Sequence, residues 1–390
     1  KKKVTNQKKL DSVVASISAA KVAYTDAQIA EAEEIIGVLL NAGNPDLQDV
    51  LLYALGKVGS LNSLDILAQA AANDNYRMDK KGATEAYIAL INRLIAQGHL
   101  KEATKAAQKL QKEAVKAEEE QIRIAALQIL LHAESAKGAE DNSKSIKLIM
   151  TALKDDSRTY RNAALDFASD FSNEDLYIKL LQLVDKSESD LKVDLLEWFR
   201  REAADTFKRN SLQNLNLSSK RSAEDVFIEQ LSSADFNVKQ AAAWLLVRMG
   251  AQSSVPLLAS LLKNEDKQVV LLGQDALAAF PGAINDAVVA VLPTATDAGK
   301  IAGLELLSMR KAVSGLSAVL GQITSTSPEV KKTAYATLKD VVEKGDFDKM
   351  CEVLEAADTD ARTSAQLAVI SSLSSLPVAE QLAKIKQRMS

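Results

Sequence analysis

A short sequence pattern that recurs along the chain constrains its fold more than any other feature. Most copies consist of an apolar anchor residue, often followed by a basic residue, with small apolar residues three and four positions after the anchor. Clear copies are QIRIAA at 121–126, YRNAA at 160–164, NVKQAA at 237–242 and EVKKTA at 329–334. Anchors stand at positions 160, 191, 238, 269, 298, 330 and 361, and successive position numbers differ by 31, 47, 31, 29, 32 and 31. A period of about 31 residues, broken once, indicates a protein built from structural repeats.

Each anchor is expected to open an α-helix. Positions 0, +3, +4, +7 and +11 from an anchor fall on one face of a helix, which gives the helix a buried stripe. In one copy these positions hold Val238, Ala241, Ala242, Leu245 and Met249. A second amphipathic stretch precedes the anchored helices, as residues 254–262 do before the anchor at 269. The repeating unit is therefore predicted to be a helix, a short turn and a second helix.

Composition favours helices over a turn-rich β fold. The 390 residues include only 15 Gly and 6 Pro, and aromatic residues make up 4%. Few residues therefore interrupt a helix or form the tight turns that β proteins need. Small residues at +3 and +4 would let the second helix approach its partner closely, so that neighbouring units share one core. We therefore expect an all-α fold of stacked helix pairs.

The pattern resembles HEAT-type repeats, in particular the short HEAT-like repeats first named from phycobilisome lyases. Their hallmark is a first helix of the type seen at residues 255–262, a turn that contains Asp, and a second helix that begins Val-Arg-x-Ala-Ala. The resemblance covers about residues 44–390, although Val270 and Gly299 replace the basic residue and residues 81–83 lack an apolar anchor. It implies a right-handed α-solenoid, an α-α superhelix, of about ten stacked helix pairs.

A stack of repeats needs polar caps at its two ends. Residues 1–43 are predicted to form an N-terminal helical cap, with helices at 8–24 and 26–40. Residues 44–375 would hold the repeats, and residues 376–390 a C-terminal capping helix. Basic residues in the last turns of that segment suit a helix C-terminus. The chain is therefore expected to be one stack with two caps.

The wide spacing between the anchors at 191 and 238 indicates an insertion at about residues 203–222. Insertions in repeat proteins often carry the specific contact. The segment and the residues just before it supply six cations and one aromatic residue: Arg200, Arg201, Phe207, Lys208, Arg209, Lys220 and Arg221. Such a basic segment could receive a phosphate, an acidic peptide or a glycan acid. The alternative is a solvated loop with an additional short helix.

A basic residue follows the anchor in six copies, and acidic residues usually precede it. The set is Arg123, Arg161, Lys192, Lys239, Lys331 and Arg362. One hypothesis is a charged strip for an anionic ligand. The other is a structural charge ladder, in which each cation pairs with a carboxylate of its own or the next repeat. The family that the pattern resembles uses this position structurally, so we favour the ladder.

Two aromatic residues stand at a helix position that is otherwise polar. The sixth position after the anchor lies about 120° from the centre of the buried stripe, and it holds Tyr53 and Trp244 in two copies. Large aromatics at a solvated position are candidate contact residues, because Trp and Tyr dominate binding hot spots. The alternative is that Trp244 covers the neighbouring repeat. Trp198, one position further in its helix, is expected in the core.

No catalytic constellation appears in the sequence. His99 and His132 lie in different repeats, the single Cys351 excludes an internal disulfide and a cysteine-based zinc site, and no Gly-rich phosphate loop is present. The net charge of −4 disfavours nucleic acid as a partner. No apolar run approaches the ~20 residues of a membrane span. We therefore expect a protein that is not an enzyme, with no cofactor and no metal.

The first functional hypothesis is a scaffold, presumed monomeric, whose extended surface binds a protein or peptide partner. The alternative comes from the resemblance, because HEAT-like units of this class also occur in lyase-like proteins and in larger exported enzymes. The chain would then be the repeat region of a lyase- or glycan-associated enzyme whose catalytic domain is absent here. The start at Lys1 is compatible with a removed signal peptide or with a trimmed cytoplasmic protein.

Overall fold

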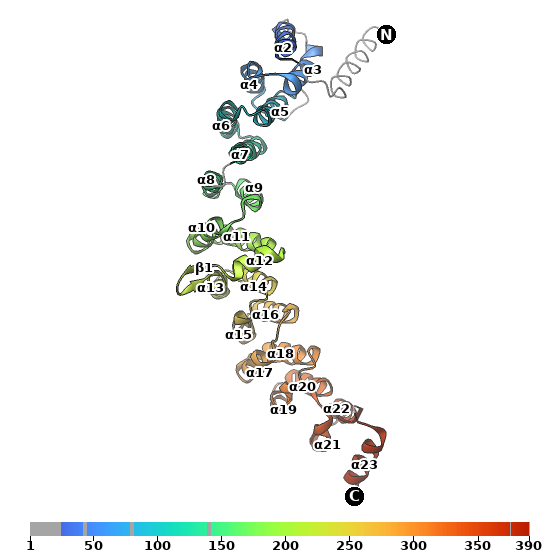
Figure 1. The fold of residues 1–390 in the computed structure, drawn as a ribbon. Helices are drawn as coiled ribbons and strands as arrows, with labels where there is room; N and C mark the ends of the chain where they lie inside the picture. The colour runs from blue at the N-terminus through green and yellow to red at the C-terminus, as the bar shows by residue number, and fades with distance from the viewer. Residues whose placement is uncertain (1–24, 42–44, 79–81, 139–141, 375, 390) are drawn as a thin grey trace, which may run out of the picture. The chain divides into compact units, whose positions relative to one another are not determined.

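The computed structural model describes residues 25–41, 45–78, 82–138, 142–374 and 376–389 (Figure 1). The chain divides into two compact units, Lys1–Ser172 and Asn173–Ser390, called here the N-terminal and the C-terminal unit. The described residues form 22 α-helices, 20 of them in ten stacked pairs, and one short β-ribbon. The prediction of an all-α repeat fold is therefore confirmed.

The N-terminal unit consists of four helix pairs in its described part. The first helix of each pair packs on the second, and the second helices α3, α5, α7 and α9 pack on one another in chain order. The elements are α2 (Asp26–Asn41), α3 (Pro45–Val58), α4 (Ser63–Asn73), α5 (Ala83–Ala96), α6 (Leu100–Lys116), α7 (Glu120–Ser135), α8 (Ser143–Ala152), α9 (Arg158–Ala168) and the 3-10 turn η1 (Ser169–Phe171). A continuous apolar core runs from Ile36 to Ala133.

The C-terminal unit holds six more pairs, α10/α11, α13/α14, α15/α16, α17/α18, α19/α20 and α21/α22. Its helices are α10 (Glu174–Lys186), α11 (Ser189–Glu202), α12 (Thr206–Gln213), α13 (Ala223–Glu229), α14 (Phe236–Met249), α15 (Val255–Ser260), α16 (Lys267–Ala279), α17 (Asn285–Val291), α18 (Asp297–Met309), α19 (Leu316–Gln322), α20 (Pro328–Val341), α21 (Phe347–Ala356), α22 (Arg362–Ser374) and α23 (Val378–Met389). Its other elements are β1 (Asn216–Ser218), β2 (Arg221–Ser222), η2 (Gln230–Ser232), η3 (Gln252–Ser254), η4 (Leu261–Lys263), η5 (Leu292–Thr294), η6 (Val313–Gly315) and η7 (Lys344–Asp346). The ten described pairs agree with the expected number.

A polar side chain three residues before the anchor starts several of the second helices. The Ser157 hydroxyl accepts a hydrogen bond from the backbone N–H of the anchor Tyr160 at 3.2 Å. Asp235 accepts one from the N–H of Val238 at 3.4 Å, and also caps the preceding residue. These side chains satisfy donors that a helix N-terminus leaves without an internal partner. The anchor is thus the third residue of its helix.

The same cap corrects one predicted anchor. Thr296 accepts a hydrogen bond from the N–H of Gly299 at 3.2 Å, and Gly299 is buried whereas Ala298 is only half-buried. The anchor position is therefore 299 rather than 298, and Lys300 takes the place of the basic residue. The sequence pattern missed this because glycine, with no side chain, does not read as an apolar residue. With this correction the intervals to the anchors at 269 and 330 become nearly equal.

Glycines in the second helices permit very close packing, both within a pair and between neighbouring pairs. A Cβ atom added to Gly299 would lie 1.7 Å from the carbonyl oxygen of Leu262 in η4. One added to Gly303 would lie 2.9 Å from Leu292 Cδ2, and one on Gly273 would lie 2.8 Å from Leu261 Cβ. Real Cβ atoms do not approach other atoms this closely, so larger residues would push the helices apart.

The first and the last helices of the chain are described in part. The predicted helix at 8–24 lies outside the described residues, and α2 packs on α3 as the first helix of a pair. At the other end, Arg388 of α23 forms a 2.7 Å ion pair with Glu355 of α21, and Lys384 lies 5.7 Å from the ring centre of Phe347. The division into cap, repeats and cap stays a prediction, as does the handedness of the stack.

The segment of the predicted insertion is a folded element. It forms the short helix α12 and an antiparallel ribbon of β1 and β2. One of the two expectations was a solvated loop with a short helix, and the ribbon takes the place of that loop. Leu212 and Leu215 are 0% and 5% exposed, so apolar burial holds the segment against the unit. Ser222 and Asp225 form a reciprocal capping box at the start of α13, which fixes the exit of the ribbon.

Candidate functional site

Carboxylates neutralise at least three of the six cations predicted at the insertion. Arg221 forms a two-pronged ion pair with Asp185 at 2.7 and 2.9 Å and a second pair with Glu229 at 2.6 Å. These hydrogen bonds raise the pKa of Arg221 above its usual value, and the bond to Asp185 has the largest effect. Lys208 pairs with buried Glu202 at 2.8 Å. In α11, Arg200 pairs with Glu197 one turn earlier at 2.6 Å.

The remaining residues of the predicted basic surface are spread out. Arg201 and Lys220 are exposed, and the Arg209 guanidinium lies 3.4 Å from the Thr206 hydroxyl. Phe207 is 80% exposed, which is high for an aromatic residue. The structure thus turns much of this segment into internal ion pairs, and its role in binding stays a prediction.

The two aromatic candidates lie in different units and have different surroundings. Tyr53 on α3 is 46% exposed, and Lys57, one turn later, lies 5.4 Å from its ring centre. Trp244 on α14 is half-buried. Trp198 is fully buried, as expected, and stacks edge-to-face on Phe199 with ring centres 5.2 Å apart.

The six basic residues after the anchors make several kinds of contact. Arg123 and Lys331 form ion pairs with Asp155 and Asp358, which lie in the turn between the two helices of the next repeat. The other two described contacts go to carbonyl oxygens: Arg161 donates to Asp155 and Asp156 at 2.8 and 2.9 Å, and Lys239 donates to Leu231 at 2.7 Å. Lys192 is half-buried and Arg362 is exposed at the same helix position.

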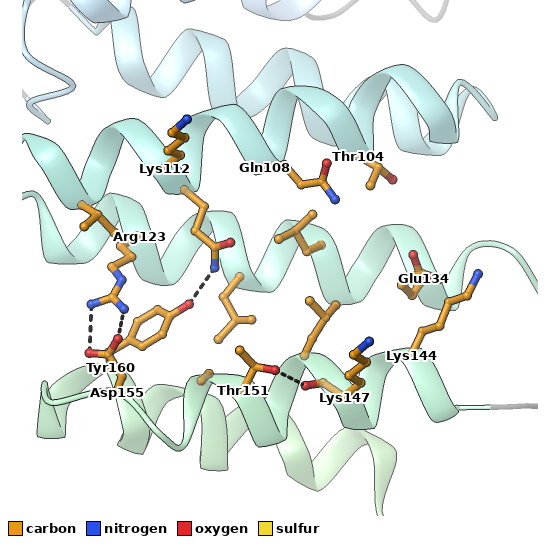
Figure 2. A pocket seen from close by; sticks show the side chains of 16 residues that line it. Thr104, Gln108, Lys112, Arg123, Glu134, Lys144, Lys147, Thr151, Asp155 and Tyr160 are labelled. Carbon is orange, nitrogen blue, oxygen red and sulfur yellow. Dashed lines mark hydrogen bonds and ion pairs between the residues drawn. The ribbon is translucent and has the colours of Figure 1, made fainter.

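A cavity of about 560 Å³ opens on the N-terminal unit between α6 and α8, above α7 (Figure 2). Sequence reasoning did not find this α6–α8 groove. One wall is a stripe of α6 residues, the floor is α7, and the opposite wall is α8. Its lining consists of Thr104, Gln108, Gln111, Lys112, Val115, Arg123, Leu127, Leu130, Glu134, Lys144, Lys147, Leu148, Thr151, Ala152, Asp155 and Tyr160.

An ordered set of polar contacts closes one end of the groove. Arg123 and Asp155 form a two-pronged ion pair, and the Arg123 guanidinium carbon lies 3.9 Å from the ring centre of Tyr160. Gln111 donates a 2.7 Å hydrogen bond to the Tyr160 hydroxyl, so α6 is tied to α9 (Figure 2). The hydrogen bonds from Arg123 keep the pKa of Asp155 below its usual value. This end is therefore fixed before any ligand binds.

Charge in the groove is not balanced. Glu134 forms an ion pair with Lys137 outside the groove, and Asp155 is paired with Arg123. Among the described residues, no carboxylate forms an ion pair with Lys112, Lys144 or Lys147. The groove therefore carries a surplus of positive charge on a chain whose net charge is −4.

The N-terminal unit also contains a buried carboxylate with a structural role. Glu33 is 6% exposed and accepts hydrogen bonds from the backbone and hydroxyl groups of Ser60 and from the Ser63 hydroxyl. Burial alone would raise the pKa of Glu33, but these hydrogen bonds outweigh it and the pKa lies below its usual value. Glu33 thus ties α2 to the turn before α4.

Catalytic groups do not converge in the described part of the chain. His99 lines a cavity of about 490 Å³ with Glu33 and Arg93, while His132 lines a different one of about 390 Å³. No group of three His, Cys, Asp or Glu side chains within the described residues is placed to hold a metal ion. None of the described helices combines the length and the apolarity that a membrane crossing requires.

Comparison with known proteins identifies the repeat type in part of the chain. Residues 193–278 match the family model described as HEAT repeats. Among solved structures, the chain is similar to an engineered protein, with 15% identity and a TM-score of 0.39, over 87% of this chain and 98% of that one.

The chain is also similar to Kap121p, with 12% identity and a TM-score of 0.48, over 92% of this chain and 43% of that one. No curated protein sequence matches the chain. The chain is thus an all-α repeat protein in which residues 193–278 match HEAT repeats.

Proposed function

We propose that the chain is a non-catalytic repeat protein that binds a protein or peptide partner. The observation that carries this proposal is the α6–α8 groove, an open cavity of about 560 Å³ formed by consecutive helix pairs. Its described lining holds no His or Cys, and its two carboxylates are ion-paired. Such a lining suits recognition of a chain segment better than acid–base or nucleophilic chemistry.

The spacing of the repeats supports a finer assignment. With the corrected anchor, positions 238, 269, 299, 330 and 361 follow one another at almost constant intervals. This short unit is the reason to propose the short HEAT-like class within HEAT repeats. The regular units would then provide the scaffold, and the irregular N-terminal unit the contact surface.

A peptide selection tests the proposed function. Random peptides displayed on phage are selected on the full chain, and bound clones are re-assayed on two variants. Gln108→Trp places a large ring at the groove wall, and Lys109→Trp places the same ring on the next residue of α6, which does not line the groove. We expect selected peptides to lose at least about tenfold in affinity for Gln108→Trp and to keep it for Lys109→Trp.

Two results would contradict the proposal. The first is a selection that enriches no peptide sequence over several rounds. The second is a set of peptides that bind both Trp variants as well as the original chain, because such peptides would not use the groove.

A further inference from the structure

We propose that the α6–α8 groove binds an extended acidic peptide segment that carries an apolar side chain. This inference rests on the proposed function and names the chemistry of its partner. It draws on three properties of the groove, namely its charge, its length and its apolar surfaces.

Charge complementarity points to an acidic ligand. Lys112 lies on the α6 wall, while Lys144 and Lys147 lie on the α8 wall, so cations border the groove on both sides (Figure 2). All three side chains are exposed. The carboxylates of the lining, Glu134 and Asp155, are engaged by Lys137 and Arg123. A carboxylate-bearing segment would therefore meet three cations and little repulsion.

The shape of the groove fits a short extended segment. The α6 stripe from Thr104 to Val115 spans about 16 Å at 1.5 Å per helical residue. An extended chain rises about 3.3 Å per residue, so roughly five residues would lie along the stripe. Gln108 is exposed midway along it, and a side-chain amide can both donate to and accept from a peptide group.

Apolar surface distinguishes this groove from a plain anion site. Leu127 and Leu130 form the floor, and Leu148 of α8 is half-buried beside them. Val115 at the end of the α6 stripe is 53% exposed. A ligand side chain that covers Val115 or Leu148 would remove apolar area from water, which a polyphosphate or a nucleic acid backbone would not do.

Charge reversal with a matched control tests the proposal. The groove variant is Lys112→Glu, Lys144→Glu and Lys147→Glu. The control is Lys101→Glu, Lys105→Glu and Lys109→Glu, which changes net charge equally on exposed α6 positions outside the groove. The probe is a fluorescein-labelled nine-residue peptide of Asp and Glu with one central Leu, followed by fluorescence anisotropy with the full chain.

We expect the groove variant to weaken binding of this peptide by at least about tenfold, because three exposed ion pairs are lost together. The control variant should stay within about twofold of the original chain, and added salt should weaken binding of the original chain. A second groove variant with Gln at the three positions should fall between them. Circular dichroism of all variants checks that the helices remain.

Other outcomes overturn the inference in distinguishable ways. Equal loss in groove and control variants would mean attraction by overall charge alone. Unchanged affinity when the central Leu is replaced by Gly, together with displacement by inorganic polyphosphate or single-stranded RNA, would indicate a polyanion site. If the phage selection yields groove-binding peptides without acidic residues, the proposed function stands and the acidic partner is rejected. Failure of the selection itself removes both.

Discussion

The two units of the chain solve the same packing problem with different regularity. In the C-terminal unit the anchors from Val238 to Ala361 recur at almost constant intervals, and the first helices α15, α17 and α19 have only 6 or 7 residues. In the N-terminal unit, the interval from the anchor Ile122 to the anchor Tyr160 is longer than any of these. There the first helices α6 and α8 have 17 and 10 residues.

This difference shows where a stack of helix pairs leaves room for a ligand. Short first helices and glycines such as Gly299 and Gly303 bring the elements of the C-terminal unit into close contact. The neighbouring first helices α6 and α8 differ in length, and the α6–α8 groove lies between them. The regular repeats thus pack closely. The larger break between the anchors at 191 and 238 is filled by α12 and the ribbon, whereas the irregular pair of α6 and α8 borders a concave site.

Among the substitutions that test this comparison, replacement of Gly299 by Ala should have the largest effect on the free energy of unfolding. The new Cβ would overlap the Leu262 carbonyl oxygen, so α18 must move away from η4. We expect the free energy of unfolding to fall by at least about 2 kcal/mol in urea titrations of the full chain. Gly321→Ala in α19, where no atom lies within 4 Å of the added Cβ, should be neutral or slightly stabilising. Equal behaviour of the two variants would contradict the close packing.

Removal of the Arg123–Asp155 pair should have the next largest effect and should depend on pH. The two side chains are 19% and 23% exposed, and we expect Arg123→Gln to cost about 2 kcal/mol at pH 7. The folded pKa of Asp155 is lower than the unfolded value of about 3.9, so the pair stabilises the fold above that pH. The contribution disappears as pH falls through the folded pKa.

The measurement compares urea unfolding of the original chain and Arg123→Gln between pH 7 and the lowest pH at which the original chain is folded. The difference between the two should shrink in acid. A difference that stays constant, or that grows as pH falls, would show that the carboxylate is not the partner that matters.

Removal of a helix-capping side chain should lower the free energy of unfolding by a smaller amount, and the loss should differ between the two units. The Asn173 side chain accepts a 2.9 Å hydrogen bond from the N–H of Leu176 at the start of α10, so Asn173→Ala should cost about 1 kcal/mol. Asn142 stands at the same position before α8, but its side chain makes no capping bond. Asn142→Ala should therefore cost only a few tenths of a kcal/mol, as measured by thermal or urea unfolding. The reverse order would refute this account of helix initiation.

The smallest effect is expected for Phe207 in the insertion. Its side chain is 80% exposed, so Phe207→Ser should change the free energy of unfolding by less than about 0.5 kcal/mol. Leu212 on the same short helix is fully buried, and Leu212→Ala should lower the free energy of unfolding by about 2–5 kcal/mol. Similar losses in both variants would mean that the exposed ring packs against the unit after all.

The helices and their register could be read from the sequence because they depend on local spacing. Val238, Ala241, Ala242 and Leu245 all prove to be buried, as their helical positions predict. The pattern predicts this anchor one residue too early, at Ala298 instead of Gly299, because a position that requires the absence of a side chain leaves no apolar signal. Its cap, Thr296, was the local signal that could have located it.

The candidate site could not be read in this way. Arg221 looked like a free cation, yet it pairs with Asp185, which lies 36 residues earlier in the chain. No sequence pattern singles out Lys144 and Lys147, yet they border a groove whose other wall belongs to α6.

The sequence by itself determined the fold class, the period and the buried stripe of each helix, because these follow from the 3.6-residue turn and from capping within a few residues. Only the tertiary structure decided which cations keep their charge exposed and where a cavity forms. These properties depend on the distance between side chains on different helices, and helix lengths and close contacts such as that of Gly299 set that distance.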